Sequence, residues 1–256
     1  MSGEIPFNRF AMIIGAMKCG TTSLFSYLED HPEICPCKTK EPEYFSENQK
    51  HGVRVDNYSE LFDFDPSKHK YVLEASTGYT KYPSEKNVAK NIFNYGIAPK
   101  FIYVVRNPFH RIESHYNYMQ RKSGWNLEIN DRHLLKTSNY YIQLKQYLEY
   151  FPLSQFLVVD FDDLCCSPDT VMTQVYDFLN ISDGFRPKNY VAHNATSVEP
   201  KLIKCAKFIQ YLLPKKEKRK LSSAERNIIF SSLQLDMKRL YIEFGFDVKK
   251  WGFDID

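Results

Sequence analysis

The sequence lacks the features that would direct it to a membrane, to nucleic acid or to secretion. No stretch approaches the roughly 20 apolar residues that a membrane-spanning helix needs. The N-terminus shows no basic segment followed by an apolar core and a cleavage site. Lys and Arg outnumber Asp and Glu by only 34 to 31, which is too mild an excess to indicate nucleic-acid binding. We therefore expect a cytoplasmic protein without a membrane or nucleic-acid partner.

Metal-binding and disulfide patterns are also missing. The six cysteines form no CxxC pair and have no histidine partners at zinc spacing. Cys35 and Cys37 are separated by one proline, and Cys165 and Cys166 are adjacent, so neither pair bridges easily. Reduced thiols, as found inside a cell, are expected. The lone histidines show no metal spacing, and no metal site is predicted.

Short apolar segments recur along the chain, and a helical pattern follows each of them. The expected strands are Phe10–Ile14, Tyr71–Glu74, Lys100–Val105 and Phe156–Asp160. The helices expected after them are Thr21–Glu29, about 84–93, a helix opened by Pro108, and Asp169–Leu179. This alternation predicts an α/β fold with a mostly parallel central sheet and helices on both faces. Ligands of such folds bind at the carboxyl ends of the strands.

The last third of the chain is expected to be helical. Ser222 and Glu225 form a capping box before an amphipathic run to Phe244, and Gly245 is a plausible helix end. With no internal repeat and no low-complexity linker, residues 1–256 are expected to form a single domain.

The segment GAMKCGTTS, residues 15–23, has the composition of a phosphate-binding loop. It follows a buried strand, its glycines let main-chain amides converge on one anion, and it opens a helix whose start carries positive dipole charge. Lys18 adds a mobile full charge. The candidate nucleotide-binding residues are Gly15, Lys18, Cys19, Gly20, Thr21, Thr22 and Ser23.

The loop differs from that of nucleotide hydrolases, which reads GxxxxGK[ST]. Here Lys18 precedes Gly20, and no Ser or Thr follows a Lys to hold magnesium. The sequence 158–160 (VVD) is the nearest candidate for a magnesium-binding Asp. A P-loop nucleotide kinase is therefore disfavoured, although it stays an alternative.

A second anion site is predicted after the third expected strand. Arg106 stands at the carboxyl end of that strand, and Ser114 lies on the helix that follows. Arg offers forked donors to a phosphate monoester, and Ser adds a hydroxyl. For the nearby Arg111 a structural role is preferred. Two separate phosphate sites indicate a nucleotide that is phosphorylated at both ends.

These motifs resemble a known family. GAMKCGTTSLFSYLEDHPEI, residues 15–34, looks like the 5′-phosphosulfate loop of sulfotransferases that use 3′-phosphoadenosine 5′-phosphosulfate (PAPS). Residues 104–116 are similar to the family's 3′-phosphate site, KEPEYFS at 40–46 to its KEPxYF segment, and EASTGY at 74–79 to its ExSPxY element. The resemblance implies a P-loop-like sulfotransferase domain that transfers a sulfuryl group to a hydroxyl or amine, releases 3′-phosphoadenosine 5′-phosphate (PAP) and uses no metal.

The resemblance also implies roles for individual residues. Arg106 and Ser114 would hold the 3′-phosphate, and Lys18 would stabilise the departing phosphate. Glu41 would be the general base, unless it is a surface carboxylate. Glu74 would be either a second acid/base group or a structural partner of Lys18. Glu43 stands where many relatives have His, and it adds negative charge near the acceptor.

The acceptor is the least determined part of the prediction. Aromatic residues make up 15% of the chain, and together with the acidic pair Glu41 and Glu43 they would suit a small acceptor, including a cationic one. A natural-product metabolite is expected, with a glycan or a lipid headgroup as the alternative. A non-catalytic binding module with the same fold is a third reading, against which the retention of Lys18 and Glu41 argues.

Overall fold

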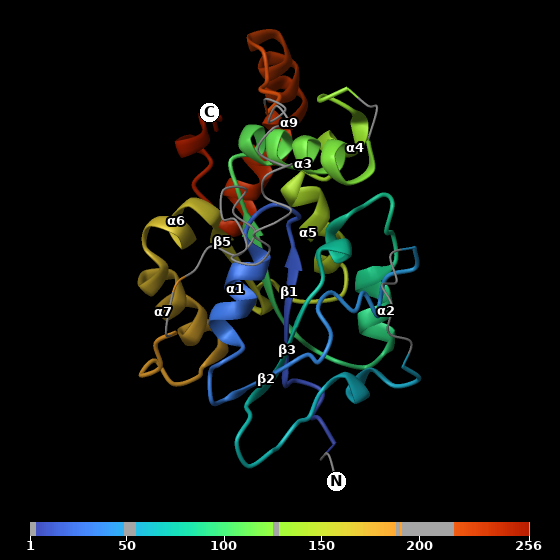
Figure 1. Ribbon diagram of the computed structural model, residues 1–256, viewed down its shortest axis with the longest axis vertical. Coiled ribbons are helices and arrows are strands. Elements are labelled where there is room, and N and C mark those ends of the chain that lie inside the picture. The colour runs from blue at the N-terminus through green and yellow to red at the C-terminus, as the bar shows by residue number, and fades with distance from the viewer. Residues whose placement is uncertain (1–3, 49–54, 125–127, 188–189, 191–217, 256) are drawn as a thin grey trace, which may run out of the picture.

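A computed structural model describes residues 4–48, 55–124, 128–187, 190 and 218–255. Five strands form one parallel sheet in the order β2-β3-β1-β4-β5 (Figure 1). The strands are β1 Phe10–Gly15, β2 Ile34–Pro36, β3 Tyr71–Ala75, β4 Lys100–Val105 and β5 Phe156–Asp160. The α-helices are α1 Thr21–Leu28, α2 Val88–Asn94, α3 Pro108–Ser123, α4 Arg132–Lys136, α5 Tyr140–Leu148, α6 Phe161–Cys166, α7 Pro168–Leu179 and α9 Ser223–Phe244. Short 3₁₀ turns are η1 Tyr58–Leu61, η2 Thr77–Thr80, η3 Leu153–Gln155 and η4 Lys249–Trp251.

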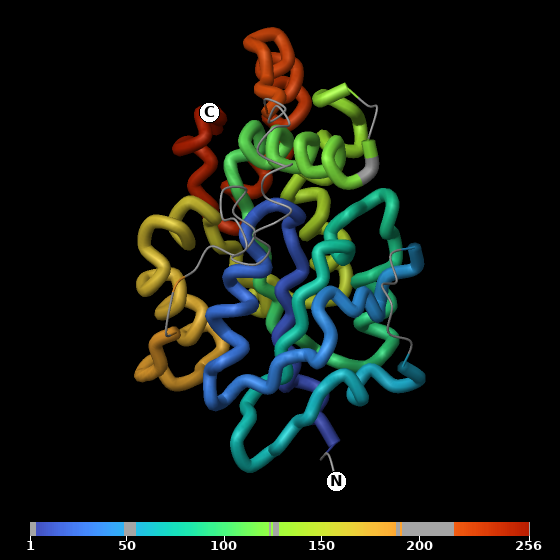
Figure 2. Tube along the Cα trace, viewed as in Figure 1, coloured from blue at the N-terminus to red at the C-terminus, as the bar shows by residue number. Residues whose placement is uncertain are grey.

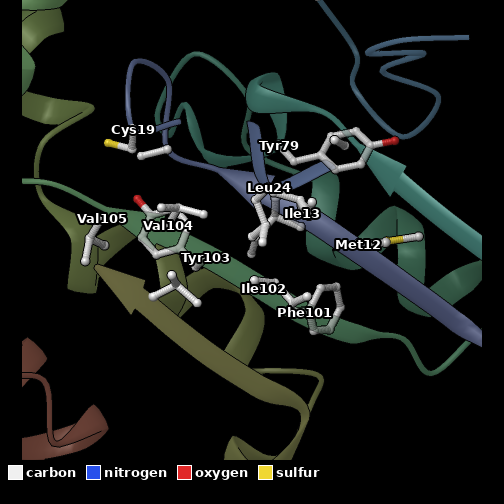
Figure 3. Close-up of a cluster of buried hydrophobic side chains, with 14 of the residues drawn as sticks. Met12, Ile13, Cys19, Leu24, Tyr79, Phe101, Ile102, Tyr103, Val104 and Val105 are labelled. Carbon is white, nitrogen blue, oxygen red and sulfur yellow. The ribbon is translucent and has the colours of Figure 1, made fainter. Parts of the chain in front are cut away.

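The sheet is built around β1, whose six residues are all buried. Figure 2 shows this N-terminal segment, in blue, running through the middle of the molecule. Apolar side chains of β1 and β4 pack together in the core, among them Met12, Ile13, Phe101 and Ile102 (Figure 3). Strands covered on both faces have to be apolar along their whole length, which is why FAMIIG and KFIYVV read as buried strands.

Helices cover both faces of the sheet. The chain passes from β1 through α1 toward β3 on one side, and from β4 through α3 toward β5 on the other. The end of α1 lies near α7, because the His31 and Tyr176 rings are 5.1 Å apart. The predicted α/β fold with a parallel sheet and helices on both faces is therefore confirmed. In the described residues no helix has the length and apolarity to cross a membrane.

Three helix ends carry the signals that the sequence shows. Pro108 occupies the first turn of α3, and the Asn107 side chain accepts a hydrogen bond from the Phe109 amide at 3.1 Å. Ser222 and Glu225 form the predicted capping box of α9, which ends at Gly245 with φ 65°. The long C-terminal helix thus begins and ends where its sequence indicates.

Two elements differ from the expectation. The strand β2 has three residues, Ile34–Pro36, and is too short to give an apolar pattern of its own. The helix expected from about residue 84 begins at Val88. Before it the chain forms a separate turn, in which the Lys81 carbonyl accepts from the amides of Ser84 and Glu85, at 2.7 and 3.1 Å.

The topology fixes where a ligand can bind. All five parallel strands have their carboxyl ends at one edge, and β1 and β4 are neighbours. In parallel sheets of this kind, ligands bind beyond the carboxyl ends of neighbouring strands whose connections run in opposite directions, and here those strands are β1 and β4. The predicted phosphate loop follows β1, and the predicted second anion site follows β4.

Candidate active site

The phosphate loop leaves β1 through backbone conformations that favour glycine. Gly15 has φ 147°, and a Cβ there would lie 2.0 Å from the Thr80 hydroxyl oxygen. Gly20 has φ 83°, and a Cβ there would lie 2.8 Å from the Phe161 ring. Both glycines are therefore needed for close packing around the loop. The first amides of an α-helix have no carbonyl four residues earlier to donate to, and the Ser23 amide donates instead to the Gly20 carbonyl at 3.0 Å.

Lys18 lies at the tip of this loop in the left-handed region, with φ 72°. Its Nζ is 4.4 Å from the centre of the Tyr118 ring on α3. Burial lowers the pKa of Lys18, and the positive charges of Arg121 and Arg106 lower it further. A cation that is desolvated beside other cations gains most from a bound anion.

Arg106 follows β4 and reaches the phosphate loop. Its Nη1 donates to the Lys18 carbonyl at 3.4 Å, and its guanidinium carbon is 4.4 Å from the centre of the Phe161 ring. The Tyr140 hydroxyl donates to the Arg106 carbonyl at 2.6 Å and so fixes the main chain. Within the described residues, the buried Arg106 Nε has no hydrogen-bond partner. A buried donor without an acceptor indicates a place for an anionic ligand.

The contact with the Lys18 carbonyl brings Arg106, one of the two residues of the second predicted anion site, next to the phosphate loop. Ser114 lies on α3 and is half-buried. Arg111, one turn before it, is fully buried: its Nη2 donates to the Leu134 carbonyl at 2.7 Å and its Nε to Ser138 at 2.9 Å. Its Nη1 reaches the Met17 carbonyl at 3.4 Å. Arg111 therefore ties the phosphate loop to the α4–α5 region, in agreement with the structural role that its sequence favoured.

The side chains of the phosphate loop differ in burial, and so in whether a ligand can reach them. The Cys19 side chain is fully buried near the Tyr140 hydroxyl, and burial raises the pKa of its thiol to about 11. The Cys19 amide donates to the Ala16 carbonyl at 3.1 Å, so both the thiol and the amide of Cys19 are engaged within the protein. Thr21 and Ser23 are buried, whereas Thr22 is half-buried.

Glu41 lies beside the start of α1. It lines a small cavity together with Thr21, Thr22, Phe25, Thr39, Lys40 and Ala75. Glu41 has φ 49°, and Glu43, on the other side of Pro42, has φ 51°. Residues other than glycine rarely adopt this backbone conformation. The loop therefore holds Glu41 in a specific orientation at some conformational cost.

Glu43 does not face the acceptor, contrary to the expectation from sequence. Its side chain is fully buried. One carboxylate oxygen accepts from the Gly78 amide at 2.8 Å and the other from the Ser46 hydroxyl at 2.8 Å. Burial raises the pKa of Glu43 to about 7, against the opposing effect of these hydrogen bonds. The main chain around Pro42 turns the Glu43 side chain inward, against η2.

The Glu74 side chain lies in the core, near the loop that carries Glu41 and Glu43. It is 1% exposed, and its carboxylate accepts hydrogen bonds from the hydroxyls of Tyr58 and Ser76 and interacts with that of Tyr79. Burial raises the pKa of Glu74. These contacts favour a structural role for Glu74, with tyrosine and serine hydroxyls as its partners in place of Lys18.

Several residues at the site were not identified from the sequence. Phe161 stacks on Arg106, Tyr118 lies under Lys18, and Tyr140 holds the main chain of Arg106. Each acts on a residue far away in sequence, which a local pattern does not reveal. In the parts of the chain that the structure describes, no group of His, Cys, Asp and Glu is arranged to hold a metal ion.

Comparisons with known proteins agree with this geometry. The model of the sulfotransferase domain family matches residues 9–225. The chain is 28% identical to heparan sulfate glucosamine 3-O-sulfotransferase 5 of Homo sapiens over 188 residues, which are 67% of this chain and 53% of that protein. The chain thus spans about half the length of this curated relative.

Two solved structures share the fold. The sulfotransferase from Alicyclobacillus acidocaldarius has a TM-score of 0.72 at 24% identity, over 97% of this chain and 100% of that one. The sulfotransferase domain from the curacin biosynthetic pathway has a TM-score of 0.53 at 17% identity, over 90% of this chain and 98% of that one.

Replacement of Gly20 tests the packing between the phosphate loop and Phe161. In Gly20→Ala, the left-handed conformation costs roughly 1 kcal/mol, and the added Cβ displaces the Phe161 ring from Arg106. We expect PAP affinity, measured by calorimetry, to fall by at least about fivefold. Gly184→Ala is the matched control, since its Cβ would meet only the Ser182 hydroxyl at 3.6 Å. Equal affinities for PAP in the two variants would contradict the assigned packing.

Proposed function

The chain belongs to the sulfotransferase domain family, and from that premise we propose that it transfers the sulfuryl group of PAPS to a hydroxyl or amine of a small acceptor. The observation that supports this most is the contact between the phosphate loop and Arg106 at the ends of β1 and β4. Two anion sites in one crevice suit a nucleotide with phosphate at both the 3′ and the 5′ position.

In this proposal the phosphate loop holds the 5′-phosphosulfate. The amides at the start of α1, the Thr22 hydroxyl and Lys18 surround the place where negative charge accumulates on the departing phosphate. Arg106 and Ser114 hold the 3′-phosphate, and the Arg106 Nε that lacks a protein partner is one donor for it. Phe161 keeps the guanidinium flat against its ring.

The transfer follows from these positions. The acceptor oxygen or nitrogen forms a bond to sulfur as the bond between sulfur and the 5′-phosphate oxygen breaks in line. Glu41 accepts the proton that the acceptor loses. Lys18 neutralises the charge that develops on the leaving oxygen. The shared cavity of Glu41 and Thr22 supports this assignment, because it places the carboxylate next to the start of α1.

The acceptor is proposed to be a small natural-product metabolite. A glycan is the second candidate, and the relative named as a heparan sulfate sulfotransferase favours it. Glu43 is buried, so it gives no support to a cationic acceptor. Incubation with labelled PAPS and two panels, one of small alcohols and amines and one of sulfate-poor oligosaccharides, distinguishes these two acceptor classes.

The base assignment is tested by Glu41→Gln. We expect kcat to fall by about 100-fold or more, because the amide cannot take the acceptor's proton, while PAP binding measured by calorimetry stays within about twofold. Glu60→Gln, at an exposed carboxylate of η1, is the matched control and should keep its turnover. If Glu41→Gln retains near-normal turnover, Glu41 is not the base.

Lys18→Ala tests stabilisation of the leaving phosphate. We expect turnover to fall by about 100-fold or more, since loss of one preorganised charge at the developing anion has an effect of that size. The exposed Lys90→Ala on α2 serves as the control. A variant that keeps its kcat and shows only a raised KM for PAPS would assign Lys18 to binding alone.

Arg106→Ala tests recognition of the 3′-phosphate. Loss of a charge-assisted hydrogen bond of about 1.5–3 kcal/mol should weaken PAP binding by roughly 10- to 100-fold. AMP, which lacks the 3′-phosphate, should bind to the variant and to the unchanged protein with similar affinity. If calorimetry shows that the two nucleotides lose affinity equally, Arg106 does not read the 3′-phosphate. Magnesium-dependent ATP binding in the same experiment would favour a kinase.

A further inference from the structure

The guanidinium of Arg106, which the proposed function assigns to the 3′-phosphate, rests on a ring that belongs to another strand end. Phe161 directly follows β5 as the first residue of α6, and its ring centre is 4.4 Å from the Arg106 guanidinium carbon. The same ring lies against the phosphate loop, because a Cβ on Gly20 would be 2.8 Å from it. The position of the guanidinium therefore depends on where α6 starts.

The start of α6 is set by Asp160, the last residue of β5. In the sheet Asp160 is paired with Val105, the residue before Arg106. One of its carboxylate oxygens accepts a hydrogen bond from the Asp162 amide at 2.7 Å and so caps the first turn of α6. The other oxygen forms an ion pair with the Lys250 ammonium of η4. A single carboxylate thus connects β5, α6 and η4.

The two members of this ion pair differ in burial. The Asp160 side chain is 2% exposed, whereas that of Lys250 is 34% exposed. The Lys250 ammonium is also 3.4 Å from the Asp163 carboxylate, so it bridges the end of β5 and the first turn of α6. A buried carboxylate costs free energy unless a cation or hydrogen-bond donors compensate it. Without the ammonium, the Asp160 carboxylate gains by moving toward water, and the start of α6 moves with it.

The turn η4 also contacts the residue that holds the main chain of Arg106. Trp251, next to Lys250, has its ring centre 6.1 Å from that of Tyr140. The Tyr140 hydroxyl donates to the Arg106 carbonyl at 2.6 Å and accepts from the Arg106 amide at 3.3 Å. The turn η4 therefore packs against the support of the Arg106 main chain, while its lysine fixes the helix that supports the Arg106 side chain.

We propose that Lys250 is a positioning residue for recognition of the 3′-phosphate. Its ion pair with Asp160 fixes the start of α6, and with it the Phe161 ring that supports Arg106. This inference rests on the proposed role of Arg106 at the 3′-phosphate. In the described part of the chain the buried Arg106 Nε has no hydrogen-bond partner, so the ring under the guanidinium decides where this donor points. Lys250 acts through that ring and needs no contact with the nucleotide.

The test measures by calorimetry how Lys250→Met binds PAP and AMP, of which AMP lacks the 3′-phosphate. We expect the affinity for PAP to fall by roughly 5- to 20-fold, less than in Arg106→Ala, because the guanidinium is displaced and not removed. The affinity for AMP should stay within about twofold, since the groups that bind the rest of the nucleotide are unchanged. A general loosening of the fold would weaken both nucleotides and leave the preference for PAP as it was.

Three further variants serve as controls. Lys250→Arg should keep the affinity for PAP, because it keeps the charge beside Asp160. Lys249→Met, at the neighbouring exposed lysine of η4, is the matched control and should bind both nucleotides as the unchanged protein does. Asp160→Asn breaks the same ion pair without leaving a buried charge, and it keeps a side-chain oxygen for the helix cap. It should lose affinity for PAP as Lys250→Met does, and it replaces that variant if Lys250→Met does not fold.

An unchanged preference for PAP over AMP in Lys250→Met overturns the inference, and so does an equal loss of affinity for both nucleotides. Arg106→Ala, measured in the same experiment, separates this inference from the proposed function. If Arg106→Ala loses the preference for PAP while Lys250→Met keeps it, only the role of Lys250 fails. If Arg106→Ala keeps the preference, the proposed 3′-phosphate site fails and the role of Lys250 fails with it.

Discussion

The hydrogen bond from the Arg106 guanidinium to the Lys18 carbonyl, 3.4 Å long, is the contact on which the site depends. It joins the segments that follow β1 and β4, two adjacent parallel strands whose carboxyl ends lie at one edge. Arg111 adds a second link from α3 to the Met17 carbonyl of the loop. These links hold the phosphate loop against the segments that follow β4, so that Lys18 and Arg106 lie close together at one edge of the sheet.

Burial gives the charges of the site their function. Lys18 has a pKa lowered by burial, so it bears a desolvation cost that a nearby anion offsets. The buried carboxylates, in contrast, have hydrogen-bond donors within the protein. Glu74 is satisfied by hydroxyl groups, and Glu43 by the Gly78 amide and Ser46. The fold therefore satisfies these two acids internally, whereas Lys18 lies beside other cations, which suits a site for a phosphorylated donor.

The sequence predicted the parts of the fold and site that are local. β4 and β5 have the expected bounds, and Lys18 and Arg106 lie at the strand ends where their motifs indicated. β2 was missed because three residues carry too little pattern. The inward turn of Glu43, the ring of Phe161 and the position of Lys250 were missed for a different reason. Each depends on a partner distant in the chain, such as Gly78 for Glu43 or Arg106 for Phe161, and no local pattern encodes such pairs.

The inward turn of Glu43 changes the expectation for the acceptor. The sequence alone suggests two carboxylates that face it, which would attract a cation. In the structure Glu41 lines the cavity beside Lys40, and Glu43 is buried. Glu43 therefore adds no negative charge to the surface that would face the acceptor, and the expectation of a cationic acceptor loses that support. The loop around Pro42 thus determines both the base and the charge of its surroundings.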